Sequence, residues 1–232
     1  MKYYYDLHIH SVLSACADIL MTPNNLWNMA TLKGLDFLGF VDHNSAKQLP
    51  MLAQIGESYQ AKQVFGLELS LASGIHVLCY FETLEDALHF SNWIESYLDL
   101  TPYSIQQLGE QILTDKEDFT VETIPYYLNQ PLKLSLQTIK DALKPMNHLF
   151  VLAHWNRYLE LGKEVLLSGH FDAVEWTDFK HPCKEFSPVP ILFNSDAHDL
   201  TNISERQPLN TISVKEHTVK ALFEAIRHGN HR

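Results

Sequence analysis

The 232-residue sequence predicts an α/β fold with a parallel sheet. Short apolar runs rich in β-forming residues alternate with longer segments of helical periodicity, a rhythm typical of repeated βα units. The length suits an α/β barrel formed as one unit, and 46% hydrophobic residues are enough to bury a core. Strands are expected at Tyr3–His8, Phe37–Val41, Val64–Leu69, His76–Tyr80, Leu149–Ala153, Ala173–Trp176, Ile191–Asn194 and Leu209–Ser213.

Helices are expected between these strands. One begins at Thr22, a favourable N-cap followed by proline, and ends before Gly34, a good C-terminal stop. Others are expected at Glu82–Leu98, where apolar residues recur at helical spacing, and at Thr218–His228. The segment from about 99 to 145 breaks the rhythm, being more polar, helical in pattern and punctuated by prolines. We interpret it as a small helical insertion, a cap within a single domain covering residues 1–232.

Composition limits the classes of function. The net charge is −11, so the surface repels a nucleic-acid backbone, and we expect no tight binding to duplex nucleic acid. A small phosphorylated substrate is compatible with this charge, because bound cations reverse the field locally. Three cysteines without CxxC spacing, no signal peptide and no apolar run of membrane-spanning length predict a cytoplasmic protein that does not enter a membrane. The sequence leaves the oligomeric state open.

Histidines and carboxylates lie at the borders of the predicted strands. His8 and His10 are two residues apart, so in a strand both side chains point to one face. Glu68 ends an apolar strand, where a carboxylate is costly to bury unless it is paired or bound to a cation. Mixed imidazole and carboxylate ligands favour zinc, manganese or iron over calcium, which prefers oxygen ligands alone. Magnesium is less expected than zinc, manganese or iron. The border residues are His8, His10, Asp42, His43, Glu68, His76, His154, Asp196 and His198.

Four motifs in order, with two further residues, carry a family resemblance. They are His8-Ile9-His10, Asp42-His43, His154 and Asp196-Ala197-His198, accompanied by Glu68 and His76. In these motifs the sequence resembles the PHP (polymerase and histidinol phosphatase) superfamily, over the first and the last third of the chain. The resemblance implies a distorted (β/α)7 TIM-like barrel that holds two or three divalent metal ions and hydrolyses a phosphate ester.

The resemblance also implies a distribution of the ligands. One metal would be held by His8, His10, Glu68 and Asp196. A second would be held by Glu68, His76 and His154, with Glu68 bridging the two. His43 and His198 would contribute to a third, which needs a further ligand from the loop after His10. That loop is longer than the form common in the family, and Asp18 is the candidate, with Cys16 as the alternative.

Several residues are candidates for roles other than holding metal. Arg157 stands where the family has an arginine that contacts phosphate, and guanidinium geometry suits a bidentate contact with phosphate. Arg206 is a second candidate for that contact. His198 or Asp42 is expected either to protonate the leaving group or to orient ligands. Glu175 also ends a predicted strand and is expected to have a structural or supporting role.

The predicted function is a metal-dependent phosphoesterase acting on a small molecule, with a nucleotide or a short oligonucleotide among the candidates. A histidinol-phosphatase-like enzyme is the alternative among enzymes. The alternative outside the enzymes is a non-catalytic metal-binding module of the same family. A metal amidohydrolase is disfavoured, because it would want a carboxylated lysine bridging the metals, whereas Lys62 precedes its strand and Lys180 lies in a loop.

Overall fold

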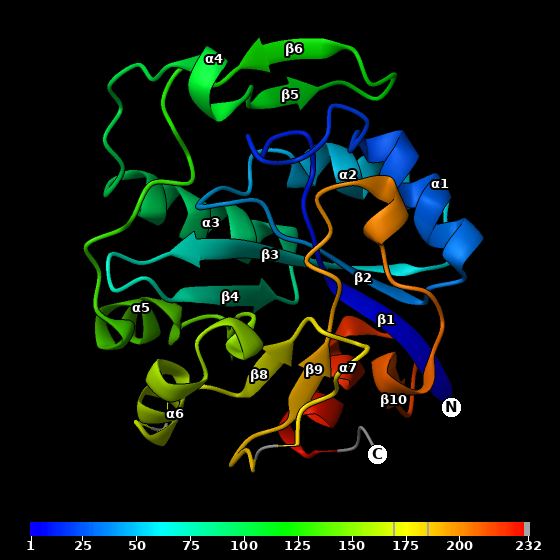
Figure 1. Cartoon of the computed structure of the whole chain (residues 1–232). Helices are drawn as coiled ribbons and strands as arrows, with labels where there is room; N and C mark the ends of the chain where they lie inside the picture. The colour runs from blue at the N-terminus through cyan, green and yellow to red at the C-terminus, as the bar shows by residue number, and fades with distance from the viewer. Residues whose placement is uncertain (169, 185, 230–232) are drawn as a thin grey trace.

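The computed structural model describes residues 1–168, 170–184 and 186–229, and in it all eight predicted strands form. They belong to one sheet with the order β10-β1-β2-β3-β4-β7-β8-β9 (Figure 1). The bounds are β1 (Lys2–Ile9), β2 (Phe37–Phe40), β3 (Lys62–Ser70), β4 (His76–Phe81), β7 (His148–Leu152), β8 (Ala173–Trp176), β9 (Ile191–Phe193) and β10 (Thr211–Ser213).

The sheet is mixed, so the prediction of a parallel sheet is correct only in part. Strands β1, β2 and β3 run parallel, as do β7, β8 and β9, whereas β4 is antiparallel to both β3 and β7, and β10 is antiparallel to β1. Residues 71–75 join β3 to β4, and a link this short allows only a hairpin, since a parallel connection needs a crossover of a dozen residues or more. The start of β4 therefore lies at the same edge as the end of β3.

The sheet curls until its two sides approach each other at one end. Ala197, shortly after β9, forms a parallel bridge with Ile9 at the end of β1. Its N–H donates to the His8 carbonyl at 3.1 Å, and the N–H of His10 donates to the Ala197 carbonyl at 3.0 Å. The result is a curled, half-barrel sheet, and a completely closed (β/α)7 barrel stays a prediction.

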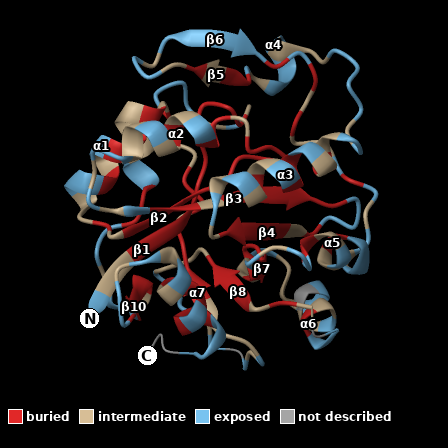
Figure 2. Ribbon diagram, turned by 180° about the vertical axis from the view of Figure 1, so that it is seen from behind, coloured by how far each residue is buried: buried red, intermediate tan, exposed pale blue. Residues whose placement is uncertain are grey.

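Two hydrophobic layers cover the two faces of the curled sheet. On β4, Leu78 and Tyr80 point inward to one cluster while Val77 and Cys79 point outward to another, because successive side chains of a strand face opposite sides. Helices α1 (Pro23–Lys33), α2 (Leu49–Gly56), α3 (Leu84–Glu95), α5 (Leu136–Leu143) and α6 (Leu159–Leu167) cover the outside, and α7 (Val219–Arg227) packs into the inner cluster. In Figure 2 the buried strands run through the centre, with exposed helix faces around them. No described helix has the length and apolar character needed to cross a membrane.

The segment from 99 to 145 is less helical than its pattern predicts. It contains a single-turn helix α4 (Ile105–Leu108), a two-stranded sheet of β5 (Ile112–Thr114) and β6 (Thr120–Thr123), and then α5. The hairpin forms because β-branched residues flank a turn in which Asp118 takes a left-handed conformation, φ 64°. It lies above the loops that follow β1 and β2 (Figure 1), where the N–H of Ile112 bonds the Val12 carbonyl at 3.2 Å. Its assignment as an inserted cap in a single domain stays a prediction.

Candidate metal centre

The predicted metal ligands, Asp18 apart, converge at the edge of the sheet where the parallel strands end. Three overlapping groups have ligand atoms within 4.8 Å of one another. The groups are His8, His10, Glu68 and Asp196; His43, Glu68 and His76; and His10, His43 and His198. His154 joins them through Glu68, whose Oε1 lies 2.9 Å from its Nε2. His76 reaches the cluster because β4 runs antiparallel, which brings the first residue of that strand to this edge.

Two of these positions have backbone conformations that L-residues rarely adopt. His154 has φ 30° and Asp196 has φ 55°, both in the left-handed region. Each residue follows the end of a strand, so the chain turns sharply there and directs the side chain toward the cluster. Left-handed backbone at a residue other than glycine costs on the order of 1–2 kcal/mol and persists where the surroundings impose it.

Glu68 lies at the centre of the cluster, with different imidazoles around its two oxygens. Oε1 lies 2.8 Å from His76 Nδ1 and 2.9 Å from His154 Nε2. Oε2 lies 3.1 Å from His43 Nδ1, 3.2 Å from His10 Nε2 and 3.4 Å from His8 Nε2. Burial alone would raise the pKa of Glu68, but the imidazoles of His43 and His8 hold that pKa well below its usual value. This arrangement supports the predicted bridging role of Glu68.

The hydrogen bonds of His8 and His10 turn two nitrogen lone pairs toward each other. Nδ1 of His8 donates to Glu175 at 2.9 Å, which leaves Nε2 without a proton in the neutral ring. Nδ1 of His10 lies 2.9 Å from Ser14 Oγ, and that hydroxyl already donates to Asp42 at 2.7 Å, so it accepts from His10. The two Nε2 atoms are 3.1 Å apart. Two facing lone pairs repel unless a cation, either a proton or a metal ion, lies between them.

Several buried atoms of the cluster have no hydrogen-bond partner among the described residues. They include Glu68 Oε2, Asp196 Oδ1 and His43 Nδ1. Buried polar atoms are normally satisfied, and a set of imidazole nitrogens and carboxylate oxygens fits a divalent transition-metal ion. The residues present therefore fit the metal that the sequence predicts.

Two buried carboxylates hold the ligands in place from behind. Glu175 accepts from His8 Nδ1, from the His154 N–H at 2.9 Å and from Asn194 Nδ2 at 2.8 Å. Such a partner fixes the tautomer and orientation of a metal-binding imidazole. The expectation of a supporting role for Glu175 agrees with these contacts.

Asp42 accepts from three donors, the N–H and Oγ of Ser11 at 2.8 and 2.5 Å and Oγ of Ser14 at 2.7 Å. It thereby orients His10 through Ser14, which supports the orienting role among the two expected for Asp42. Ser11 and Ser14 carry no signal of their own in the sequence, and only the geometry reveals their contribution.

The structure does not bring Asp18 into the cluster. Its side chain is exposed, and Oδ1 accepts from the Leu20 N–H at 2.8 Å in a local turn. The backbone of Asp18 does reach the site, because its N–H donates to the His198 carbonyl at 2.7 Å. Cys16, the alternative, is exposed and is likewise outside the three groups.

The two candidate arginines lie in different places. Arg157 is half exposed in a single-turn helix after β7, and its Nη2 donates to Asp196 Oδ2 at 2.5 Å. Arg206 donates to the Gly34 carbonyl and stacks on Tyr4, 4.6 Å from the ring centroid. Arg157 therefore stands at the metal cluster, whereas Arg206 packs against the outer face of β1.

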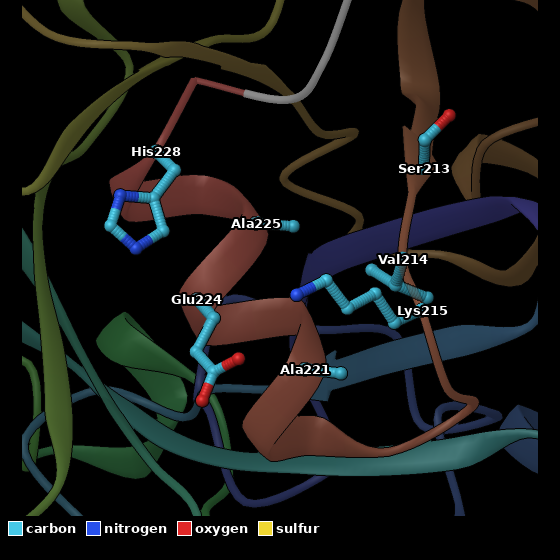
Figure 3. A pocket seen from close by; sticks show the side chains of 7 residues that line it. All are labelled: Ser213, Val214, Lys215, Ala221, Glu224, Ala225 and His228. Carbon is cyan, nitrogen blue, oxygen red and sulfur yellow. The ribbon is translucent and has the colours of Figure 1, made fainter.

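A cavity of about 370 Å³ adjoins Asp196, and Thr177, Phe179 and Asn202 are among the residues that line it. A smaller pocket of about 80 Å³ lies between β10 and α7, where Lys215, Glu224 and His228 surround it (Figure 3). The smaller pocket is distant from the cluster, because its lining residue Ser213 pairs with Lys2 at the opposite end of β1. The larger cavity touches the cluster through Asp196, whereas none of the residues that line the smaller pocket belongs to the cluster.

Comparison with known proteins supports the resemblance at the level of the fold. No family model matches the chain. The uncharacterized protein YqxK of Bacillus subtilis (strain 168) is 27% identical over 237 residues, which cover 87% of this chain and 56% of that protein. The lesion-specific endonuclease PfuEndoQ from Pyrococcus furiosus superposes with a TM-score of 0.70 at 21% identity, over 98% of this chain and 56% of that one.

Another solved structure links this fold to the predicted family. A two-domain protein from Bacteroides vulgatus, which contains a predicted PHP-like metal-dependent phosphoesterase, superposes with a TM-score of 0.57 at 13% identity, over 99% of this chain and 64% of that one. The chain therefore shares its fold with a PHP-like protein, which agrees with the fold that its motifs predict. The chain spans about half the length of YqxK and of PfuEndoQ.

Two predictions about the binding partner are wrong: that duplex nucleic acid is not bound tightly, and that the partner is a small phosphorylated molecule. An endonuclease Q of the same fold, with a TM-score of 0.67 and 19% identity over 98% of this chain and 57% of that one, binds a 27-mer duplex with an abasic lesion at its active site. The error lies in using the net charge of the whole chain, because the charge at the site itself decides what binds there.

Replacing Glu175 with glutamine should weaken metal binding without unfolding the protein. Glutamine keeps the volume but presents an N–H₂ group to donors that need an acceptor, so His8 loses its fixed orientation. We expect metal affinity to fall by about 10–100-fold, the usual effect of losing such a partner. Titration calorimetry with Mn²⁺ measures this, with the exposed Glu160→Gln as control. Equal affinities in the two variants would contradict the role.

Metal binding should release protons near pH 7. Burial lowers the pKa of His10, but contacts with Asp196 and Glu68 outweigh burial and raise it to about 9, and the pKa of His8 is also raised. These imidazoles must lose their protons to bind metal. Calorimetry in buffers of different ionisation enthalpy should show the release.

The same pKa shifts set the stability of the metal-free protein. Because the folded pKa of His10 lies above the ordinary 6.5, its contribution to stability is complete below pH 6.5 and is lost as pH rises to about 9. The free energy of unfolding in a chelator should therefore fall over that range. In the calorimetry experiment described above, binding heats that do not depend on the buffer would contradict the charged state of His8 and His10 in the metal-free protein.

Proposed function

We propose that this chain is a metal-dependent phosphoric ester hydrolase whose substrate is a phosphodiester of nucleic acid. The observation that carries the proposal is the buried Glu68 carboxylate, which has separate sets of imidazoles at its two oxygens and Arg157 close by at Asp196. Two adjacent cation positions with a guanidinium beside them form an arrangement suited to a phosphoryl group.

The cluster suits two or three divalent cations, with zinc, manganese or iron favoured by the nitrogen-rich donor set. His8, His10, Glu68 and Asp196 would hold the first, and Glu68, His76 and His154 the second. His43 lies between these sets and, with His10 and His198, offers a third position. When bound, the cations supply the Lewis-acid chemistry of phosphate ester hydrolysis.

The chain's own residues bind and orient the substrate. Arg157 is half exposed, so its guanidinium can leave Asp196 and contact a phosphate oxygen. Burial, with the nearby His10, lowers the pKa of His198 to about 4, so its ring is neutral at pH 7. A neutral ring whose Nδ1 donates to the Asp196 carbonyl at 2.9 Å is suited to be a ligand and is a poor acid.

Nucleic acid is the proposed substrate class for two reasons. The half-exposed Arg157 and the partly exposed His76 and His198 form the surface side of the cluster, where a phosphate of a large substrate can approach. A neighbour of this fold binds duplex DNA with a lesion at its active site. For a longer protein that contains this fold, the same hydrolytic activity is likewise only proposed.

Metal content and turnover test the proposal directly. Protein purified without a metal-affinity tag should contain two or three metals per chain and should hydrolyse bis(p-nitrophenyl) phosphate and DNA in the presence of Mn²⁺. His8→Ala and Asp196→Ala should abolish hydrolysis and lower the metal content, because each removes a ligand of the first position. Full activity with unchanged metal would end the assignment. A wild-type protein that neither holds metal nor turns over would instead be a binding module.

Arg157→Ala should raise KM by about 10–100-fold while the protein keeps its metal, since a charge-assisted contact contributes roughly 1.5–3 kcal/mol. Arg206→Ala is the matched control, because it removes the same charge from a side chain packed on Tyr4 and should leave KM unchanged. Steady-state kinetics on the small diester distinguishes the two variants. Equal KM values for both would assign Arg157 to the surface.

A further inference from the structure

Three large apolar side chains are exposed on two adjoining loops beside the metal centre. Ile19 and Leu20, in the loop that follows His10, are 59% and 57% exposed. Phe119, in the turn between β5 and β6, is 70% exposed. We call Ile19, Leu20 and Phe119 the apolar rim. Single exposed apolar residues are common, but several gathered at the edge of a functional site indicate a contact surface.

The loop that carries Ile19 and Leu20 is held by its backbone. The N–H of Val12 donates to the Met21 carbonyl at 2.8 Å, which closes the base of the loop. Within it, the N–H of Leu20 donates to Asp18 Oδ1 at 2.8 Å. The two apolar side chains are therefore presented on an ordered turn, so little conformational entropy is lost when they are covered.

The same loop is bonded to the β5–β6 hairpin, above it in Figure 1. Thr22 Oγ1 donates to Asp118 Oδ2 at 2.6 Å, and the N–H of Asn24 donates to Asp118 Oδ1 at 3.2 Å. Phe119 directly follows Asp118. Phe119 therefore lies on a turn that is hydrogen-bonded to residues two and four positions after Leu20.

The rim borders the metal centre on the side of His10 and His198. The loop begins directly after His10, and the Asp18 N–H is bonded to the His198 carbonyl at 2.7 Å. Ile19 is the next residue. When the phosphate of a substrate lies at the cluster, the groups on either side of that phosphate therefore contact the apolar rim.

The geometry points to the apolar rim as a wedge that inserts between bases of a nucleic-acid duplex next to the phosphodiester at the metal centre. This inference rests on the proposed function. His8, His10 and Glu68 are buried behind the partly exposed His76 and His198, so a phosphate reaches them only if the duplex backbone is displaced locally, and that displacement unstacks bases. Apolar side chains inserted between base steps stabilise such a distortion. The endonuclease Q duplex has an abasic lesion, an interrupted stack, at the active site of that protein.

The test compares Ile19→Ser/Leu20→Ser with Leu32→Ser, which alters an apolar residue that is 80% exposed on α1. All three side chains are exposed, so the fold tolerates the changes. The probe is a DNA duplex with one abasic site flanked by 2-aminopurine. Anisotropy reports binding and 2-aminopurine emission reports unstacking. Hydrolysis of bis(p-nitrophenyl) phosphate with Mn²⁺ reports the metal centre.

For the double variant we expect duplex affinity to fall by roughly tenfold or more, the size expected when two apolar side chains lose their burial. The 2-aminopurine emission should fall with it, and the ratio of duplex to small-diester hydrolysis should drop. Leu32→Ser should match the wild type in every measurement. Phe119→Ser should show a smaller loss in the same direction.

Unchanged binding and unstacking by the double variant would overturn the wedge while leaving the proposed function intact. A wild-type protein that hydrolyses the small diester but binds no duplex would overturn the wedge and the nucleic-acid substrate together. A wild-type protein that is inactive on both substrates would reject the proposed function itself, and the wedge with it.

Discussion

The structure depends on one buried carboxylate. Glu68 is 1% exposed and lies at the end of β3, a central strand of the sheet, where an uncompensated charge would cost several kcal/mol. Its neighbours on both sides supply the compensation. His43, after β2, places Nδ1 3.1 Å from Glu68 Oε2, and His76 reaches Oε1 from the antiparallel β4. The hairpin that reverses β4 is therefore a requirement of the site, because a parallel strand would place its first residue at the opposite end of the sheet.

Two further carboxylates control which ring nitrogen of His8 and of His10 faces the centre. Glu175 acts on His8 directly, and Asp42 acts on His10 through Ser14. Because Nδ1 of His8 and Nδ1 of His10 are engaged from behind, Nε2 of each ring points inward, where it can hold a proton or a metal ion. Glu175 also accepts the backbone N–H of His154, so the same carboxylate stabilises the left-handed turn that delivers this ligand. Orientation and backbone strain at the site are thus stabilised by the same buried groups.

The strands and most members of the cluster could be predicted because their signals are local: apolar β-forming runs that end in histidine or carboxylate. Features that depend on which segments of the chain meet in the folded protein could not be predicted from the sequence. The sequence gives no measure of how far Arg206 lies from Arg157, although only Arg157 stands at the cluster. Asp18 has the chemistry of a ligand, but a turn engages its carboxylate with the Leu20 N–H. The 99–145 segment combines weak helical periodicity with β-branched residues, and contacts with the loops after β1 and β2 favour the hairpin.

The net charge of the whole chain was a poor guide to nucleic-acid binding, and the site gives the physical reason. Five of the 28 acidic residues, Asp6, Asp42, Glu68, Glu175 and Asp196, are buried in or behind the cluster, so they add little to the field at the surface. Two divalent cations would cancel four negative charges at the point where a phosphate would lie. The rim beside that point adds apolar surface at Ile19, Leu20 and Phe119. Affinity for a nucleic acid would then come from the cations, Arg157 and apolar contact, with little contribution from a basic surface.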